Sequence, residues 1–149
     1  MPEQSGTDVA FNGVTPILRV TDFDASVAWY TDVLGFSLDW RDDSFGCITR
    51  GDVALMLSQG TQGCTSTWMW IGVSDTDALH AELVRRGARI RVPPTNYPWG
   101  SRECHVFDPD GHVLRFGSDL RPGEPMGPWL DEAGTRWQPQ PDGSWTQIT

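Results

Sequence analysis

Val20-Thr21-Asp22-Phe23-Asp24-Ala25 recurs 53 residues later as Val73-Ser74-Asp75-Thr76-Asp77-Ala78. Each copy follows an apolar run typical of a strand and precedes a segment whose apolar residues have helical spacing. The hydroxyl residue or the aspartate that follows it is a good N-cap, so each copy marks the start of a helix. Self-similarity at a fixed offset indicates two copies of one structural unit.

The sequence around the two copies matches in the same order. Each predicted helix ends at a glycine, Gly35 or Gly87, the usual residue of a left-handed C-cap. Three extended segments then follow in each half, and the last two of the second half are joined by the turn signal Asp108-Pro109-Asp110-Gly111. The segments are 36–40, 45–50 and 53–58 in the first half, and 89–92, 103–107 and 112–117 in the second.

We therefore predict an α+β fold with two tandem βαβββ modules, whose curved mixed sheets carry helices on one side and form a concave cup on the other. The predicted division is an N-terminal arm at 1–13, modules at 14–60 and 66–120, and a C-terminal extension at 121–149. Within the extension, Asp142-Gly143 predicts a hairpin turn in which Trp137 and Trp145 pair across strands. The extension could cap the cup, extend a dimer or pack on the far side.

Composition excludes several classes of protein. A chain of 149 residues that is 38% hydrophobic suits one compact domain, and no apolar run reaches the roughly 20 residues that cross a bilayer. A net charge of −9 argues against nucleic acid as a partner; it could favour cationic ligands or merely keep the protein soluble. Three cysteines without CxxC spacing argue for a reducing cytoplasm.

The two modules resemble the vicinal oxygen chelate superfamily of glyoxalases, bleomycin-resistance proteins and extradiol dioxygenases. The resemblance covers about residues 14–120 and rests on residues 20–22, on Trp29-Tyr30-Thr31-Asp32-Val33-Leu34-Gly35-Phe36 and on residues 108–112. Trp68-Met69-Trp70 and the segment 98–103 are most similar to the bleomycin-resistance branch. This resemblance implies a homodimer with two ligand crevices that binds a cationic drug without changing it.

Metal enzymes of this superfamily place His or Glu on the concave face, at the start of the first strand and in the last strand of each module. Alternation along the strands maps these places to Thr15, Trp68 and Arg115. A threonine hydroxyl is a poor ligand, an indole is none and a guanidinium repels cations. His105 and Glu103 could face the cup together, but two groups do not complete a metal site. We therefore expect no metal and no cofactor.

Aromatic residues take the place of ligands in this cup. The resemblance implies that Phe45 of one subunit and Trp99 of the other hold a planar ring between them, above a floor of tryptophans. Arg115 is expected either to pair with Glu103 across adjacent strands or to touch an anionic ligand group. Packing in the core is the alternative for Trp40, and a structural place is expected for His80 and His112. The full set of expected ligand-binding residues is Trp40, Phe45, Trp68, Trp70, Trp99, Glu103, His105 and Arg115.

These observations favour a non-catalytic protein that confers resistance by sequestering a bleomycin-type or other aromatic, cationic antibiotic. No nucleophile pattern is present, and alternation places Cys104 on the face opposite His105. Two alternatives stay open: an enzyme of the same fold, lyase-like or dioxygenase-like, that acts on a small metabolite, and an accessory protein that holds a ligand or partner. The expected partners are a small antibiotic and a second copy of the chain, and neither nucleic acid nor a membrane.

Overall fold

The first half of the chain forms the predicted βαβββ module. A computed structural model describes residues 8–149. Its first module consists of β1 (Ile17–Arg19), α1 (Phe23–Asp32), β2 (Ser37–Arg41), β3 (Phe45–Arg50) and β4 (Val53–Ser58). The four strands make one mixed sheet in the order β1-β4-β3-β2, in which β1 runs parallel to β4 and the other pairs are antiparallel.

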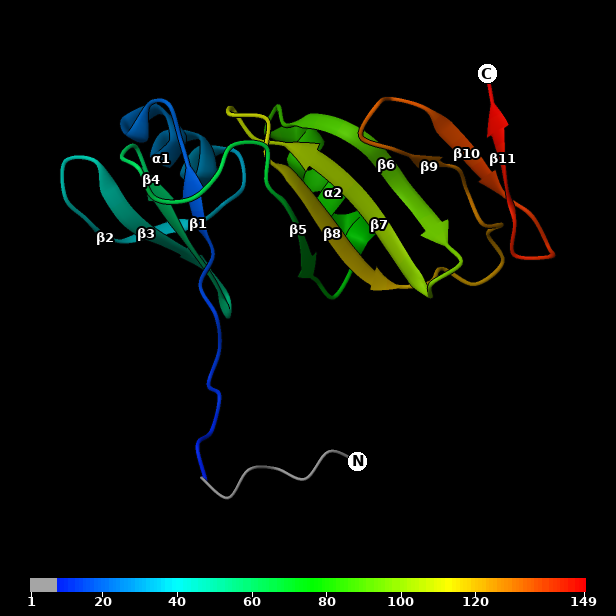
Figure 1. Cartoon of the computed structure of the whole chain (residues 1–149), viewed down its shortest axis with the longest axis horizontal. Helices are drawn as coiled ribbons and strands as arrows, with labels where there is room; N and C mark the ends of the chain where they lie inside the picture. Colours follow the sequence, from blue (N-terminus) through cyan, green and yellow to red (C-terminus); the bar gives the residue numbers. More distant parts are fainter. Residues whose placement is uncertain (1–7) are drawn as a thin grey trace.

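The second half repeats this arrangement. It consists of β5 (Trp68–Gly72), α2 (Thr76–Arg85), β6 (Arg89–Tyr97), β7 (Ser101–Phe107) and β8 (Val113–Asp119). The strand order β5-β8-β7-β6 is the order of the first sheet shifted by one module, and the first and last strands are again parallel. Figure 1 shows the two modules side by side, each with its helix against its sheet. The predicted duplication and fold class are confirmed.

Both helices begin where the repeated stretch predicts. The Asp22 side chain accepts from the backbone N–H of Ala25 at 3.0 Å, and Asp75 accepts from Ala78 at 2.9 Å. These aspartates, rather than the hydroxyl residues before them, are the N-caps. Past the helix ends, Gly35 has φ +70°, a left-handed conformation that a residue with a Cβ adopts only with strain.

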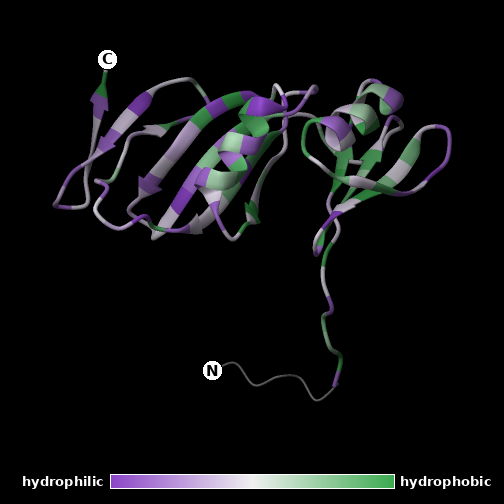
Figure 2. Ribbon diagram, turned by 180° about the vertical axis from the view of Figure 1, so that it is seen from behind, coloured by the Kyte–Doolittle hydropathy of each residue, from purple (hydrophilic) through white to green (hydrophobic). Residues whose placement is uncertain are grey.

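A continuous hydrophobic core lies between the helices and the sheets. Leu114 and Phe116 of β8 and Ile71 of β5 are buried in it, so alternate residues of these strands point to the opposite face. Figure 2 shows hydrophobic residues on both helices and on the strands behind them. The alternation that assigns Trp68 to the concave face therefore leaves Ile71 beneath α2.

Polar contacts join the two modules. The Tyr30 hydroxyl donates to Asp108 Oδ2 at 2.8 Å, and both groups are buried. His112 is also fully buried: its Nε2 lies 2.7 Å from the Arg19 carbonyl, and its Nδ1 accepts from the Thr67 N–H at 2.9 Å. His112 is therefore structural, as the sequence suggested.

The hairpin of β6 and β7 is longer than the extended segments predicted at 89–92 and 103–107. Its register shifts between Ile90 and Val92 and again between Val92 and Thr95. These irregularities accommodate Pro93 and Pro94, which have no N–H to give to a regular ladder. The longer strands bring the turn at 98–100 to the end of the sheet, where Gly100 has φ +86°.

The extension forms a third small sheet of β9 (Trp129–Leu130), β10 (Arg136–Pro139) and β11 (Trp145–Ile148), in the order β11-β10-β9. The predicted hairpin is present, but the prediction that Trp137 pairs with Trp145 is wrong. The turn closes with Pro139 opposite Trp145, which puts Trp137 opposite Gln147 on one side and Trp129 on the other. Within residues 8–149, no helix is long and apolar enough to cross a membrane.

Candidate ligand-binding site

The face of the second sheet that points away from α2 gathers most of the expected site residues. Strand register aligns Trp70 with Arg115 and Arg115 with His105, so these side chains form a row across β5, β8 and β7. Glu103 lies two residues before His105 and therefore faces the same way. Cys104 points into the core behind them, as alternation predicted, and has no exposed surface.

Glu103 is the centre of this cluster. Its Oε1 accepts from Arg115 Nε at 2.9 Å and lies 3.0 Å from His105 Nε2, while its Oε2 accepts from Arg115 Nη2 at 3.1 Å and from Trp99 Nε1 at 2.8 Å. Burial raises the pKa of Glu103, but the hydrogen bonds from His105, Arg115 and Trp99 outweigh it and bring the pKa to about 2. The carboxylate is therefore ionised at neutral pH and has both oxygens in use. The predicted Glu103–Arg115 pair is confirmed.

His105 is held as a neutral imidazole. Its side chain has no exposed surface, and burial lowers its pKa more strongly than the bond to Glu103 raises it. Because the carboxylate can only accept, the Nε2 of the neutral ring carries the proton and donates it to Glu103. Nδ1 then keeps its lone pair and has no partner among the described residues. His105 orients Glu103 and is not exposed to a ligand in this structure.

Trp99 is an exposed ring held in a fixed orientation. It lies in the turn at 98–100, is 48% exposed, and is tied to Glu103 through its indole N–H. One face stacks on the buried ring of Tyr97, with centroids 4.7 Å apart and planes 13° apart. Such a ring is a preorganised stacking surface, because little of its rotational freedom is left to lose on binding.

Trp70 is the second exposed ring on this face, at 53%. It lies across Gly117 and Gly72: a Cβ built at Gly117 would collide with Trp70 Nε1 and come within 2.7 Å of Ser101 Oγ. Trp70 and Trp99 line an open crevice of about 850 Å³ together with Glu103, Arg115 and Asp119. This volume is within the usual range for small-molecule sites.

Three other expected residues are differently placed. Trp68 is covered, with the Arg91 guanidinium 4.8 Å from its ring centroid and Trp129 6.2 Å away. Trp40 and Phe45 lie on the first sheet and stack on each other at 5.6 Å, with planes 27° apart. Trp40 is 45% exposed, so the alternative of core packing is wrong for it. A sandwich between Phe45 and Trp99 of different subunits stays a prediction.

The extension packs on the concave face of the second module, beside β6 (Figure 1). Trp129 contacts the rings of Tyr97, Trp99 and His105 at centroid distances of 5.5, 5.4 and 5.4 Å, all close to edge-on. The Arg115 guanidinium lies 5.0 Å from the centroid of Trp129. The sequence left three places open for the extension. In this chain the extension covers the cup of the second module.

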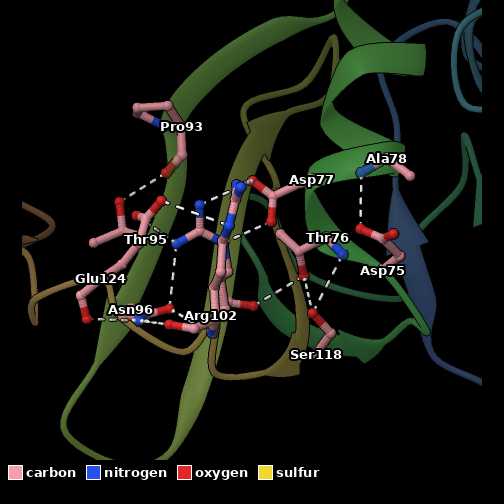
Figure 3. A network of polar contacts seen from close by, with 11 residues as sticks. Asp75, Thr76, Asp77, Ala78, Pro93, Thr95, Asn96, Arg102, Ser118 and Glu124 are labelled. Atoms are coloured by element: carbon pink, nitrogen blue, oxygen red, sulfur yellow. Dashed lines mark hydrogen bonds and ion pairs between the residues drawn. The ribbon is translucent and has the colours of Figure 1, made fainter.

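A polar network holds the start of the extension in place (Figure 3). Arg102 is almost fully buried and pairs with Asp77 at 2.7 Å and with Glu124 at 3.2 Å, which lowers the pKa of Asp77. The Asn96 side chain donates to the backbone carbonyls of Arg121 and Glu124, at 2.9 and 3.1 Å. The start of the extension is therefore fastened to β6, β7 and the start of α2.

Sequence reasoning missed five residues of this cluster. Tyr97 extends the alternating series of Trp99, Glu103 and His105 along one hairpin, a signal that was available once β6 was known to reach residue 97. Trp129, Trp137 and Trp145 are spaced by eight residues, as expected of a small meander that presents tryptophans repeatedly. Arg91 has no local signal, because its contacts are with Trp68 and with the carbonyls of Leu130 and Asp131.

The side chains on the concave face do not fit the divalent metal that enzymes of the vicinal oxygen chelate superfamily bind there. In the part of the chain that the structure describes, no three His, Cys, Asp or Glu side chains come together. The positions that hold metal ligands in those enzymes carry Thr15, Trp68 and Arg115 here. The Arg115 guanidinium forms an ion pair with Glu103. A site with this donor set has no ligand for a hard or borderline cation.

Comparison with known proteins agrees with this geometry. The chain is 29% identical over 114 residues to a bleomycin resistance protein of Klebsiella pneumoniae, a match that covers 68% of this chain and 88% of the relative. Its structure is similar to that of the bleomycin-binding protein from bleomycin-producing Streptomyces verticillus, solved with copper(II)-bleomycin, at TM-score 0.65 and 32% identity over 75% of this chain and 99% of that one. It is also similar to TioX from Micromonospora sp. ML1, at TM-score 0.65 and 27% identity over 74% and 100% of the two chains. The family model of the Glyoxalase/Bleomycin resistance protein/Dioxygenase superfamily matches residues 11–116, and the chain belongs to this superfamily.

Proposed function

We propose that this protein binds a bleomycin-type or other aromatic, cationic antibiotic on the concave face of its second module and holds it unchanged. The observation that carries the proposal is the pair of exposed indoles, Trp70 and Trp99, which line one crevice with the Glu103–Arg115 ion pair. Aromatic faces bind flat rings, and Asp119 at the rim of the crevice, with the net charge of −9, suits a cationic ligand. The names of the relatives in Klebsiella and Streptomyces support the same ligand class.

The chemistry of the site supports binding without reaction. His105, the residue best suited to accept a proton, is fully buried, so its free Nδ1 lies out of reach of a ligand in this structure. Glu103 is ionised with both oxygens occupied, so it is neither a general acid nor an available base. Burial raises the pKa of the Cys104 thiol to about 12, which makes it a poor nucleophile.

We also propose that the protein is a homodimer. The face of the first sheet away from α1 carries a row of residues that runs across all four strands: Ile17, Met56, Cys47 and Trp40. Residues 8–16, which precede β1, extend from the body of the molecule (Figure 1), with Phe11 and Val14 97% and 89% exposed. Apolar surface of this kind is usual where a second subunit packs.

A cytoplasmic location is the last part of the proposal. Cys47, Cys64 and Cys104 are all free thiols. Three unpaired thiols suit a reducing compartment better than an oxidising one.

Calorimetric titration with bleomycin tests the binding proposal, and mass spectrometry of the recovered drug tests whether it is changed. We expect saturable binding near one drug per chain, with the drug recovered intact. Trp70→Ala should weaken binding about tenfold, whereas Trp29→Ala on α1 of the first module is a control at a tryptophan outside the crevice. Turnover of the drug, or a Trp70→Ala variant with unchanged affinity, would contradict the proposal. Light scattering that gives the mass of one chain would refute the dimer.

A further inference from the structure

The extension builds a second cavity next to the crevice. Its volume is about 520 Å³, and it is lined by Trp99, Arg115, Trp129, Trp137 and Trp145. Three of the four indoles come from the extension, which lies beyond residue 116, where the match to the superfamily ends. Trp99 and Arg115 line both the cavity and the crevice, so the two spaces meet at these side chains.

The tryptophans of this cavity are arranged around Trp99. Tyr97 covers one face of Trp99, and Trp129 meets it edge-on, with planes 79° apart. Trp145 is tilted by only 32° from Trp99, with centroids 6.2 Å apart. A flat ring between two parallel rings needs about 7 Å, because carbon atoms in contact lie about 3.5 Å apart. The Trp145 and Trp99 rings are thus closer to parallel than to edge-on, and their centroids lie roughly 1 Å closer together than those of two rings that hold a third between them.

The strand that carries Trp145 is free to make this adjustment. Strand β11 is the edge of the third sheet and, among residues 8–149, pairs only with β10. Trp145 is 37% exposed, whereas Trp129 on β9 contacts several rings of the second module. A small shift of β11 would open the space while β9 stays in place.

Arg115 adds a polar requirement to the cavity. Its Nε and Nη2 donate to Glu103, and its guanidinium lies 5.8 Å from the centroid of Trp99 and 5.0 Å from that of Trp129. Its Nη1 makes no hydrogen bond within the described part of the chain, and the side chain is 25% exposed. A guanidinium N–H at the wall of an aromatic cavity suits a ring that carries a carbonyl or carboxylate oxygen.

We propose that Trp145 supplies in the same chain the stacking partner of Trp99, so that the extension completes a site for a planar aromatic ring bearing an oxygen acceptor. This inference rests on the proposed function for the identity of the natural ligand, and it makes the ring subsite intramolecular. It predicts that the ring is held without Phe45 of a second subunit.

Titration of the full chain with bleomycin and, separately, with 2-naphthoate tests the inference. Trp145→Ala should weaken both probes about fivefold to tenfold, and Trp145→Phe should recover most of the loss because it restores a ring. Trp29→Ala on α1 is the matched control and should change neither affinity more than twofold. A loss of affinity in Phe45→Ala as large as that in Trp145→Ala would place the ring between two subunits and overturn the inference. Circular dichroism and urea unfolding confirm that each variant keeps the fold.

The possible results separate the inference from the proposed function. Bleomycin binding that Trp145→Ala leaves unchanged overturns the inference and keeps the function. Tighter binding by Trp145→Ala also overturns it, because the extension would then compete with the ligand. Binding of 2-naphthoate that depends on Trp145, without any binding of bleomycin, supports the ring site and refutes a bleomycin-type ligand. Failure of both probes to bind refutes both.

Discussion

Replacement of Glu103 by glutamine tests the centre of the site with almost no change of shape. Both oxygens of Glu103 accept two hydrogen bonds, so either orientation of the new amide puts its NH₂ group against two donors. With the NH₂ group at the Oε1 position, His105 can shift its proton to Nδ1 and accept, and only the bond from Arg115 Nε is lost. This orientation keeps the bond from Trp99, so we expect the ring to stay in place.

The cost of Glu103→Gln follows from the structure in two ways. A hydrogen bond to a charged group contributes about 1.5–3 kcal/mol, and the removal of a buried carboxylate also leaves Arg115 unpaired. Independently, a pKa of about 2 in the folded chain against 4.5 for an unperturbed glutamate corresponds to about 3 kcal/mol. We therefore expect the free energy of unfolding at pH 7 to fall by about 3 kcal/mol.

Urea unfolding measures this difference, and the control is Glu82→Gln. Glu82 forms a similar two-point pair with Arg50, at 2.8 and 3.1 Å, but both side chains are partly exposed. Water and salt weaken exposed pairs, so the control should cost no more than about 1 kcal/mol. A loss for Glu103→Gln that is as small as the loss for the control would refute the account of the site.

The pH dependence gives a second check with a fixed sign. The folded-state pKa of Glu103 is lowered, so between about pH 4.5 and pH 2 the unfolded chain binds the additional proton. The contribution of Glu103 is fully present above this range and is lost as the pH falls through it. The gap between wild type and Glu103→Gln should therefore shrink from pH 6 to pH 2.5. A gap that stays constant would show that the charge of Glu103 is not its cause.

Three further substitutions test other parts of the structure. Asp75→Ala removes the N-cap of α2 and should lower the free energy of unfolding by about 1 kcal/mol, measured in urea; no change would contradict the cap. Tyr30→Phe leaves buried Asp108 without its hydroxyl donor and should lower the free energy of unfolding by about 1–3 kcal/mol in the same assay. No loss would indicate that apolar contacts, and not this hydrogen bond, join the two modules. Gly117→Ala drives a methyl group into Trp70 and should reduce bleomycin affinity in calorimetry more than tenfold; unchanged affinity would separate Trp70 from the site.

The fold could be predicted because its signals are local and repeated. The aspartate caps, the glycine stops and the Asp-Pro-Asp-Gly turn each act within a few residues, and their recurrence fixed the topology of both modules. Alternation along β7 and β8 also gave pairing with Glu103 as one of two expected roles of Arg115, and this is the role that the structure shows.

The extension could not be placed in this way. The contacts of Trp129 with Trp68 and Tyr97 join residues more than thirty positions apart, and no local pattern encodes which sheet face a short meander covers. The anchor has the same character: Arg102 lies just before the predicted segment 103–107 and has no signal of its own, yet it is buried between Asp77 and Glu124. Because the position of the extension was unknown, Trp68 was expected to line the floor of the cup. In the structure Trp129 of the extension packs against it.

The indoles packed around Trp99 should give the protein an ultraviolet circular dichroism signal that depends on the position of the extension. Electronic transitions of indoles that lie as close as Trp99, Trp129 and Trp145 couple to one another, and the coupling depends on their separation and relative tilt. Circular dichroism in the ultraviolet should therefore carry an exciton couplet while the hairpin is seated and lose it when the hairpin lifts. Circular dichroism can therefore follow the movement of the extension away from the cup in time, without any attached dye.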